Sequence, residues 1–238
     1  MSTRRLALMF AVALVMLLVA LFPLRLALGV MGAHSMGLSA ASVRGPVWSG
    51  TLAGATFGGV RLGDVKAGLD PLGLFRGGGR VWFRAVGPIE ARGVLRSGAA
   101  VFGVERLDAV LPSSLLVAGA PVEGRLQLTG VTAVFRHGDC RQAGGKVRLS
   151  DVAFGPVGGL ALQGEVRCEG RRLLLPLEGQ GQGVALRLRF TVDGQGRYEA
   201  ESLIRSSDAN LAAAGEVAGL ERTLEGYRRL DRGRLGGR

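Results

Sequence analysis

The sequence has few aromatic residues and almost no lysine. Phe, Trp and Tyr make up 5% of its 238 residues, and among 30 basic residues only Lys66 and Lys146 are lysine. A nucleic-acid-binding surface combines clustered cations with aromatic side chains. The arginines here are spread along the chain, so the composition argues against nucleic acid as a partner.

Residues for catalysis or metal binding are also scarce. The chain has two histidines, His34 and His137, and no G-x-S-x-G motif. Asp139 follows His137 closely, but neighbouring positions in sequence do not give the geometry of a catalytic triad. The Gly77–Gly79 run lacks the pattern of a phosphate-binding loop. We therefore predict no enzyme activity, no cofactor and no metal site.

One long apolar segment is present, from Leu6 to Phe22, and no second run is long enough to span a membrane. Extended by residues 24–28, it fits a single membrane crossing. Arg4 and Arg5 precede it, which favours a cytoplasmic N-terminus. The alternative is a cleaved signal peptide, although this run is longer than the apolar region of most signal peptides. Both interpretations send the rest of the chain out of the cytoplasm.

These boundaries predict four segments: a cytoplasmic tail at 1–5, an anchor at 6–28, a linker at 29–42 and an extracytoplasmic β domain at 43–238, with two possible halves meeting near 111–121. The 40 glycines imply frequent turns, and long helical patterns are absent from this domain. Strands are predicted at 43–52, 60–69, 80–86, 89–96, 99–110, 125–129, 146–150, 185–192, 197–204 and 227–235.

The strand segments carry apolar side chains on one face only. In 80–86, for example, Val81, Phe83 and Ala85 share one face and Trp82 lies on the other. Such strands form antiparallel sheets with one dry and one wet face. The expected fold is therefore mainly β: an N-terminal transmembrane helix followed by a twisted, mostly antiparallel sheet.

One or two short helices are expected among the strands. Asp70 is a candidate cap for a helical turn that Pro71 begins. Pro112 predicts a second short helix at 111–118, and an alanine-rich segment predicts another at 208–217. Residues 193–196 have the composition of a hairpin turn.

The net charge of +11 has two explanations that the sequence leaves open. The arginines are either solvated outward-facing strand positions, or they attract anionic phospholipids or acidic partner proteins.

The two cysteines, Cys140 and Cys168, lie outside the cytoplasm on this interpretation, where a disulfide is favoured. Metal binding is the rival, but His34 and His137 supply no zinc pattern.

The chain resembles protein N of the bacterial type II secretion system. The resemblance is carried by the anchor and by these motifs in order: Val43-x-Gly45-x-Val47-Trp48-x-Gly50-x-Leu52, Leu69-x-Pro71-Leu72, Cys140 followed by Gly144-Gly145, Cys168-Glu169-Gly170, and Gly194-x-Gly196-x-Tyr198. Two positions depart from it, since an aromatic residue is expected near Lys146-Val147 and Phe at Val217.

The resemblance implies an inner-membrane protein with a periplasmic domain, an accessory component that contacts other secretion subunits and supports the export of folded proteins. It implies no catalysis. More distantly, the one-sided strands resemble AsmA-type proteins, which implies an alternative: a periplasmic lipid-binding or lipid-transfer protein with a hydrophobic groove. We expect Trp48, Trp82 and Phe83 to be large apolar contributors, either to the core or to a partner contact.

Overall fold

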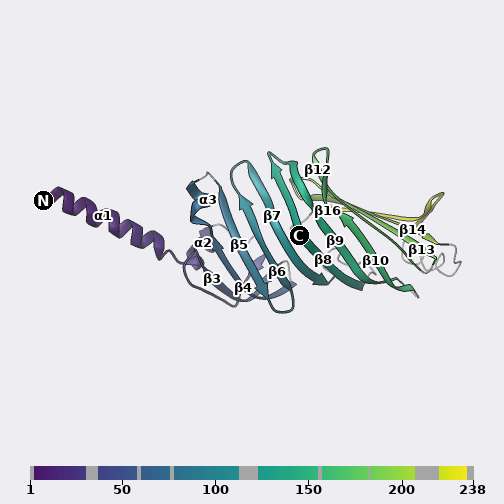
Figure 1. Ribbon diagram of the computed structural model, residues 1–238, viewed down its shortest axis with the longest axis horizontal. Coiled ribbons are helices and arrows are strands. Elements are labelled where there is room, and N and C mark those ends of the chain that lie inside the picture. Colours follow the sequence, from purple (N-terminus) through teal and green to yellow (C-terminus); the bar gives the residue numbers. More distant parts are fainter. Residues whose placement is uncertain are drawn as a thin grey trace.

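The computed structural model describes residues 3–30, 37–57, 60–75, 78–112, 123–154, 157–181, 183–206 and 220–234. It contains a long N-terminal helix that projects from one large β-sheet (Figure 1). The expected fold class is confirmed.

Three helices are described. α1 covers Thr3–Ala20 and is apolar from Leu6 onward; it ends shortly before Pro23, because proline cannot continue a helix without losing a hydrogen bond. α2 covers Leu24–Val30, so the expected anchor segment 6–28 comprises two helices. α3 covers Pro71–Phe75 and begins at proline as predicted.

The strands alternate with short turns along the chain. Their bounds are β1 Leu38–Ser39, β2 Ser42–Arg44, β3 Gly50–Phe57, β4 Val60–Leu69, β5 Gly79–Val86, β6 Glu90–Ser97, β7 Val101–Pro112, β8 Glu123–Arg136, β9 Asp139–Phe154, β10 Val157–Glu165, β11 Arg167–Glu169, β12 Arg172–Gly181, β13 Val184–Val192, β14 Arg197–Ser206, β15 Glu221–Thr223 and β16 Gly226–Arg234.

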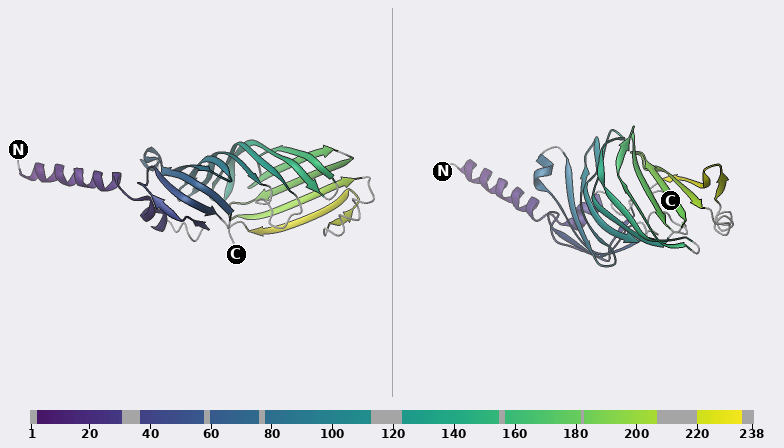
Figure 2. Two further views of the ribbon diagram at one scale, coloured as in Figure 1. Left: turned by 90° about the horizontal axis from the view of Figure 1, so that it is seen from below. Right: turned by 45° about the vertical axis from the view of Figure 1, so that its right-hand side comes forward.

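All the strands belong to one antiparallel sheet in the order β1-β3-β4-β5-β6-β7-β8-β9-β10-β12-β13-β14-β16-β15. β2 also pairs with β3, and β11 with β12. Figure 2 shows the sheet strongly curved, and it remains open, with β1 and β15 at its two ends. Register shifts between β3 and β4 and in each pairing from β6 to β10 contribute to the curvature, since bulges bend and twist a sheet.

One helix prediction is wrong at its first residues. β7 continues through Leu111 and Pro112, which pair with Leu126 and Arg125 of β8. The pairing of β7 with β8 outweighs the helix signal of the proline. Pro112 is the last residue of the strand, where the N–H that proline lacks is not needed for further pairing. Residues 113–118 and the predicted helix at 208–217 lie outside the described residues. β7 and β8, which flank the suggested boundary at 111–121, are hydrogen-bonded neighbours.

The core lies on one face of the sheet, which we call the inner face. Leu126, Leu149 and Leu162 stand side by side on β8, β9 and β10, and none is more than 2% exposed. They belong to a cluster that continues across β12, β13 and β14. The opposite face, which we call the outer face, carries the charged residues that alternate with these positions, such as Arg148 and Arg187.

Candidate functional site

The first candidate site is the junction between α1 and the sheet. Backbone hydrogen bonds join the segment after α1 to the turn between β2 and β3: the N–H of Val47 donates to Phe22 O at 2.7 Å, and the N–H of Leu24 donates to Gly45 O at 3.0 Å. Two bonds in opposite directions align the two segments like a short piece of antiparallel ladder. The chain leaving α1 is thereby paired to the sheet.

Trp48 adds a third connection. Its indole Nε1 donates a hydrogen bond to the carbonyl of Val19 at 3.1 Å, in the last turn of α1. The last carbonyls of a helix have no partner within the helix. Trp48 therefore holds the end of α1 directly.

The glycine of the same motif makes room for α2. A Cβ on Gly50 would lie 2.3 Å from Leu24 Cδ2 and 2.9 Å from the carbonyl oxygen of Arg44. A Cβ on Gly68 would lie 2.0 Å from the carbonyl oxygen of Trp48. Both positions admit only glycine without displacement of their neighbours, so the close approach of α2 and the β2–β3 turn depends on them.

α2 packs into a core of its own. Leu24 and Ala27 are 5% and 8% exposed and cluster with Leu52, Val65 and Ala85 from β3, β4 and β5. Trp48 and Phe83 pack against this cluster, and Trp82 lies against Gly68. The hydrophobic contacts of α2 therefore support the same junction as the hydrogen bonds.

Pro71 lies beside this region, at the start of α3. The N–H of Leu72 donates to Asp70 Oδ1 at 3.0 Å, so Asp70 caps α3 as predicted. Arg80 then links the capping residue to β7, with ion pairs of 3.4 Å to Asp70 and 2.6 Å to Glu105.

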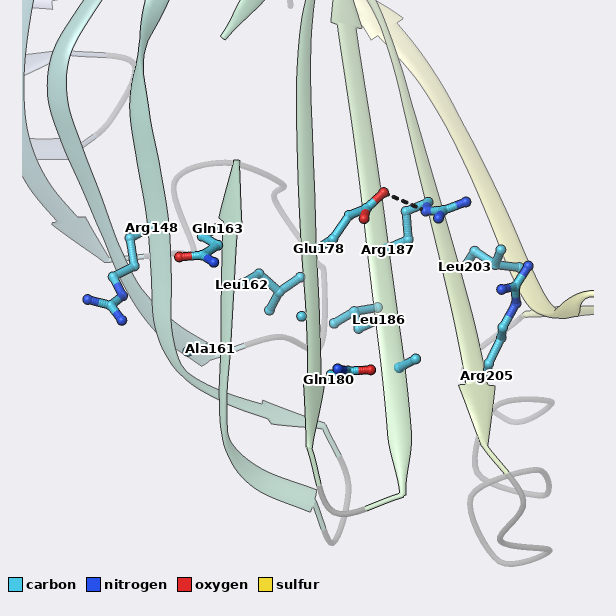
Figure 3. Close-up of a pocket in the computed structure, with 12 residues that line it drawn as sticks. Arg148, Ala161, Leu162, Gln163, Glu178, Gln180, Leu186, Arg187, Leu203 and Arg205 are labelled. Carbon is cyan, nitrogen blue, oxygen red and sulfur yellow. Dashed lines mark ion pairs between the residues drawn. The ribbon is translucent and has the colours of Figure 1, made fainter. Parts of the chain in front are cut away.

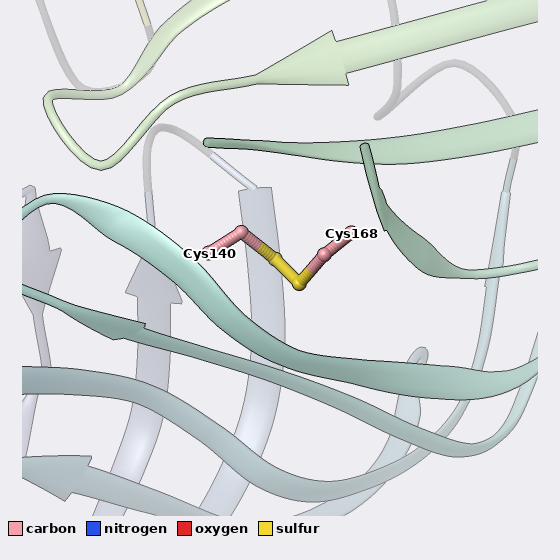
Figure 4. Close-up of a disulfide and its surroundings, with 2 residues drawn as sticks. All are labelled: Cys140 and Cys168. Carbon is pink, nitrogen blue, oxygen red and sulfur yellow. A yellow bond between two sulfur atoms is a disulfide. The ribbon is translucent and has the colours of Figure 1, made fainter. Parts of the chain in front are cut away.

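The second candidate site surrounds the disulfide. Cys140 at the start of β9 is bonded to Cys168 in β11, with their Cα atoms 5.6 Å apart (Figure 4). Phe135 and Val192 are buried beside Cys140, and Tyr198 packs against them. The disulfide that the sequence favoured is therefore present, and a metal site at these cysteines is excluded while it is intact.

Two turns meet near the disulfide. A Cβ on Gly194, in the β13–β14 turn, would lie 2.4 Å from the carbonyl oxygen of Gly138, in the β8–β9 turn. The predicted hairpin turn is closed by a hydrogen bond from the N–H of Asp193 to Arg197 O at 3.0 Å. Glycine at 194 therefore allows two distant hairpins to touch.

The carboxylate of Asp193 holds this turn together. Burial raises its pKa, but hydrogen bonds from the Arg197 side chain and from the backbone N–H groups of Arg197 and Gln195 outweigh burial. The pKa of Asp193 consequently lies below its ordinary value of 3.8. The carboxylate accepts these bonds at 2.7 to 3.0 Å.

The outer face has a shallow depression over β10, β12 and β13, with a volume of about 600 Å³ (Figure 3). Arg148, Gln163, Gln180 and the ion pair of Glu178 with Arg187, at 2.8 Å, lie around it. This is a mixed polar surface without a nucleophile and base in contact. Over the described part of the chain, no cluster of three or more His, Cys, Asp or Glu residues could hold a metal ion.

The structure thus sorts the predicted site residues into two groups. Gly45, Trp48 and Gly50 meet at the junction, with Pro71 beside it, whereas Cys140, Cys168, Gly194 and Tyr198 gather at the disulfide. Residues more than fifty positions apart in sequence share the second group.

A family model described as "Type II secretion system (T2SS), protein N" matches residues 36–230. The chain belongs to the type II secretion system protein N family. The match covers both groups of site residues and nearly the whole sheet, and begins after α1 and α2. No curated protein and no solved structure matches the chain. Membership makes this protein a component of a secretion apparatus, with other subunits of that apparatus as partners.

Sequence reasoning missed the role of α2. Leu24 and Ala27 were assigned to the membrane anchor, because an apolar run has the same composition whether lipid or protein covers it. The signal that could have separated them is Pro23 followed by Arg25, which interrupts the run. α1 alone, within the described chain, is long and apolar enough to cross a membrane.

Proposed function

We propose that this protein is an accessory inner-membrane component of the type II secretion system that acts through protein–protein contacts in the periplasm. α1 crosses the inner membrane, with the N-terminal tail in the cytoplasm. The sheet stands on the periplasmic side and contacts other subunits. The protein carries out no reaction.

The junction is the observation that carries this proposal. Hydrogen bonds from Val47, Leu24 and Trp48 attach the sheet to the end of α1, while α1 itself has no buried residue. Apolar side chains that the protein leaves uncovered are suited to lipid. An anchor attached in this way restricts the sheet to the membrane surface, which raises its effective concentration for partners held there.

The disulfide and the charges before α1 support the orientation. Disulfides persist outside the cytoplasm, in oxidising compartments such as the periplasm, and Cys140 and Cys168 are bonded. Arg4 and Arg5 precede the apolar stretch, which favours a cytoplasmic N-terminus.

The filled inner face supports contact rather than lipid carriage. A carrier needs an open apolar trough, but Leu126, Leu149 and Leu162 are covered almost completely. We find no observation that favours the lipid-transfer alternative.

The orientation is tested with alkaline phosphatase, which is active only after export, fused after Arg238 of the full chain. We expect high activity, and a matched fusion with residues 3–30 deleted is the control that should be inactive. Activity of a cytoplasmic reporter at the same position, with an inactive phosphatase, contradicts the proposed orientation.

The function is tested by deleting the gene and measuring secretion of an exoprotein into the medium. We expect secretion to fall and the full chain to restore it. A chain whose residues 3–20 are replaced by an unrelated apolar span should also restore it, because Trp48 binds a backbone carbonyl. Replacing 3–30 by a cleaved signal peptide should not. Unchanged secretion after deletion refutes the proposal.

A further inference from the structure

A row of cations crosses the outer face at the end of the sheet nearest α1. Successive register partners on β2 to β6 are Arg44, Thr51, Lys66, Arg84 and Arg92. We call these five residues the basic ladder. Its four cationic residues are exposed. Neighbouring strands lie about 4.8 Å apart, so the basic ladder is about 19 Å long.

Within the described residues, one carboxylate forms an ion pair with the basic ladder. The next register partner is Asp108 on β7, whose carboxylate pairs with Arg92 at 3.2 Å and with Arg106 at 3.7 Å. Asp64 on β4 and Glu90 on β6 also lie on this face, each two residues before a cation of the basic ladder, and Asp64 accepts a hydrogen bond from the N–H of Gly54. The other three cations of the basic ladder form no ion pair within the ranges that the structure describes.

The C-terminal half of the same face is arranged differently. There, arginines pair with glutamates of neighbouring strands: Arg187 with Glu178 at 2.8 Å, Arg228 with Glu201 at 2.6 Å and Arg232 with Glu199 at 3.0 Å. Each of these three arginines thus has a carboxylate partner, whereas Arg44, Lys66 and Arg84 have none within the described residues. A general bias towards arginine does not explain this difference.

Like charges directly opposite each other destabilise a sheet. Lys66 faces Arg84, and Arg84 faces Arg92, so the central cation of the basic ladder has a cation on both sides. Positions that oppose stability in this way are expected where they serve function. A ligand with negative charges in a row removes the repulsion.

We propose that the basic ladder binds an extended acidic segment of a partner protein. This inference rests on the proposed function and names the surface and the chemistry of one contact. A segment of about six extended residues spans the basic ladder at 3.3 Å per residue. Trp82, on the same face two residues before Arg84, lies beside the proposed site.

The direction of the basic ladder favours a protein segment over lipid head groups. Figure 1 shows α1 and the strands β3 to β6 following one another along the long axis of the molecule. The basic ladder begins at Arg44, close to the end of α1, and moves away from it to Arg92. Its far end stands off the membrane by more than the screening length of about 8 Å at physiological salt.

The test measures binding of a fluorescein-labelled Glu-Ser repeat peptide of about twelve residues to the full chain in phosphatidylcholine nanodiscs, by anisotropy at about 50 mM salt. The ladder variant is Lys66→Gln/Arg84→Gln/Arg92→Gln. The matched control is Arg187→Gln/Arg189→Gln/Arg228→Gln, which removes the same charge from exposed positions on the same face.

We expect the ladder variant to weaken binding at least about tenfold and the control to change it less than about threefold. The ladder variant should also melt no lower than the unchanged chain, because the relief of repulsion around Arg84 offsets the loss of the exposed ion pair between Arg92 and Asp108. Equal weakening by both variants, or no binding to the unchanged chain, overturns the proposal.

A second measurement decides between protein and lipid. With Trp48→Phe, Trp82 is the one remaining tryptophan, and we expect no quenching of its fluorescence by brominated phosphatidylglycerol. Strong quenching assigns the basic ladder to lipid and overturns the proposal.

In cells, reduced secretion with the ladder variant at normal abundance supports the proposal that the basic ladder binds a partner protein. If gene deletion leaves secretion intact, the proposed function fails, but the anisotropy result still decides the basic ladder.

Discussion

Substitution of Gly50 by alanine should release α2 from the sheet. The added Cβ would lie 2.3 Å from Leu24 Cδ2 and 3.1 Å from Leu24 Cβ, and 2.9 Å from the carbonyl oxygen of Arg44. Distances this short require a shift of α2 or of the β2–β3 turn. Overpacking of this kind costs about 1–3 kcal/mol. The population in which α2 is undocked should rise about 5- to 150-fold.

Trypsin reports that population, because Arg25 lies within α2. Cleavage of a folded chain needs local opening, and its rate follows the open fraction when closing is fast. The full chain in detergent micelles is treated with trypsin, and the product cut after Arg25 is followed by mass spectrometry. We expect Gly50→Ala to be cleaved faster by the factor given above.

Two further variants make the result specific. Gly144→Ala is the control, since a Cβ there has no neighbour within 4 Å, and its cleavage after Arg25 should be unchanged. Leu24→Ala alone should open α2 by removing a buried side chain, and Gly50→Ala should then add less than it does in the unchanged chain. Equal cleavage rates for Gly50→Ala and Gly144→Ala would refute the role that we assign to Gly50.

Three other predictions concern stability, measured by urea unfolding in micelles. Replacing both Cys140 and Cys168 by alanine should lower the free energy of unfolding by about 3.5 kcal/mol, the chain-entropy value for their separation of 28 residues; a loss below about 1 kcal/mol contradicts this. Leu162→Ala should cost about 2–5 kcal/mol, whereas Leu224→Ala, at a fully exposed position, should change the free energy by less than about 0.5 kcal/mol. Because the pKa of Asp193 is lowered by folding, its contribution is present above about pH 4 and is lost as the pH falls below its ordinary value of 3.8. Asp193→Asn should therefore lose less stability than the unchanged chain between about pH 5 and pH 2.5, and an identical acid dependence would exclude this role.

Much of the fold follows from local patterns. The segment 60–69 was predicted as a strand and is β4 with the same bounds, and the turn at 193–196 joins two predicted strands. Alternation has a period of two in any strand with one covered face, so it identifies strands and faces without knowledge of their partners. The cap at Asp70 is equally local.

Local patterns did not predict which strands pair with each other or in which register. The first two residues of the helix expected at 111–118 are strand instead, because the partners of β7 lie on β8, beyond the residues that a local pattern samples. The basic ladder was missed for the same reason. Lys66, Arg84 and Arg92 are unremarkable in sequence, and they become neighbours only through the register of β4, β5 and β6.

The sequence by itself determined the apolar N-terminal segment, the one-sided strands, the glycine-rich turns and the cysteines suited to a disulfide, because each depends on residue chemistry at short range. Only the tertiary structure decided that Leu24 packs on protein, that the turns at Gly138 and Gly194 touch, and that four cations align between β2 and β6. These features join residues that are distant along the chain, and the contacts of a folded sheet are what bring them together.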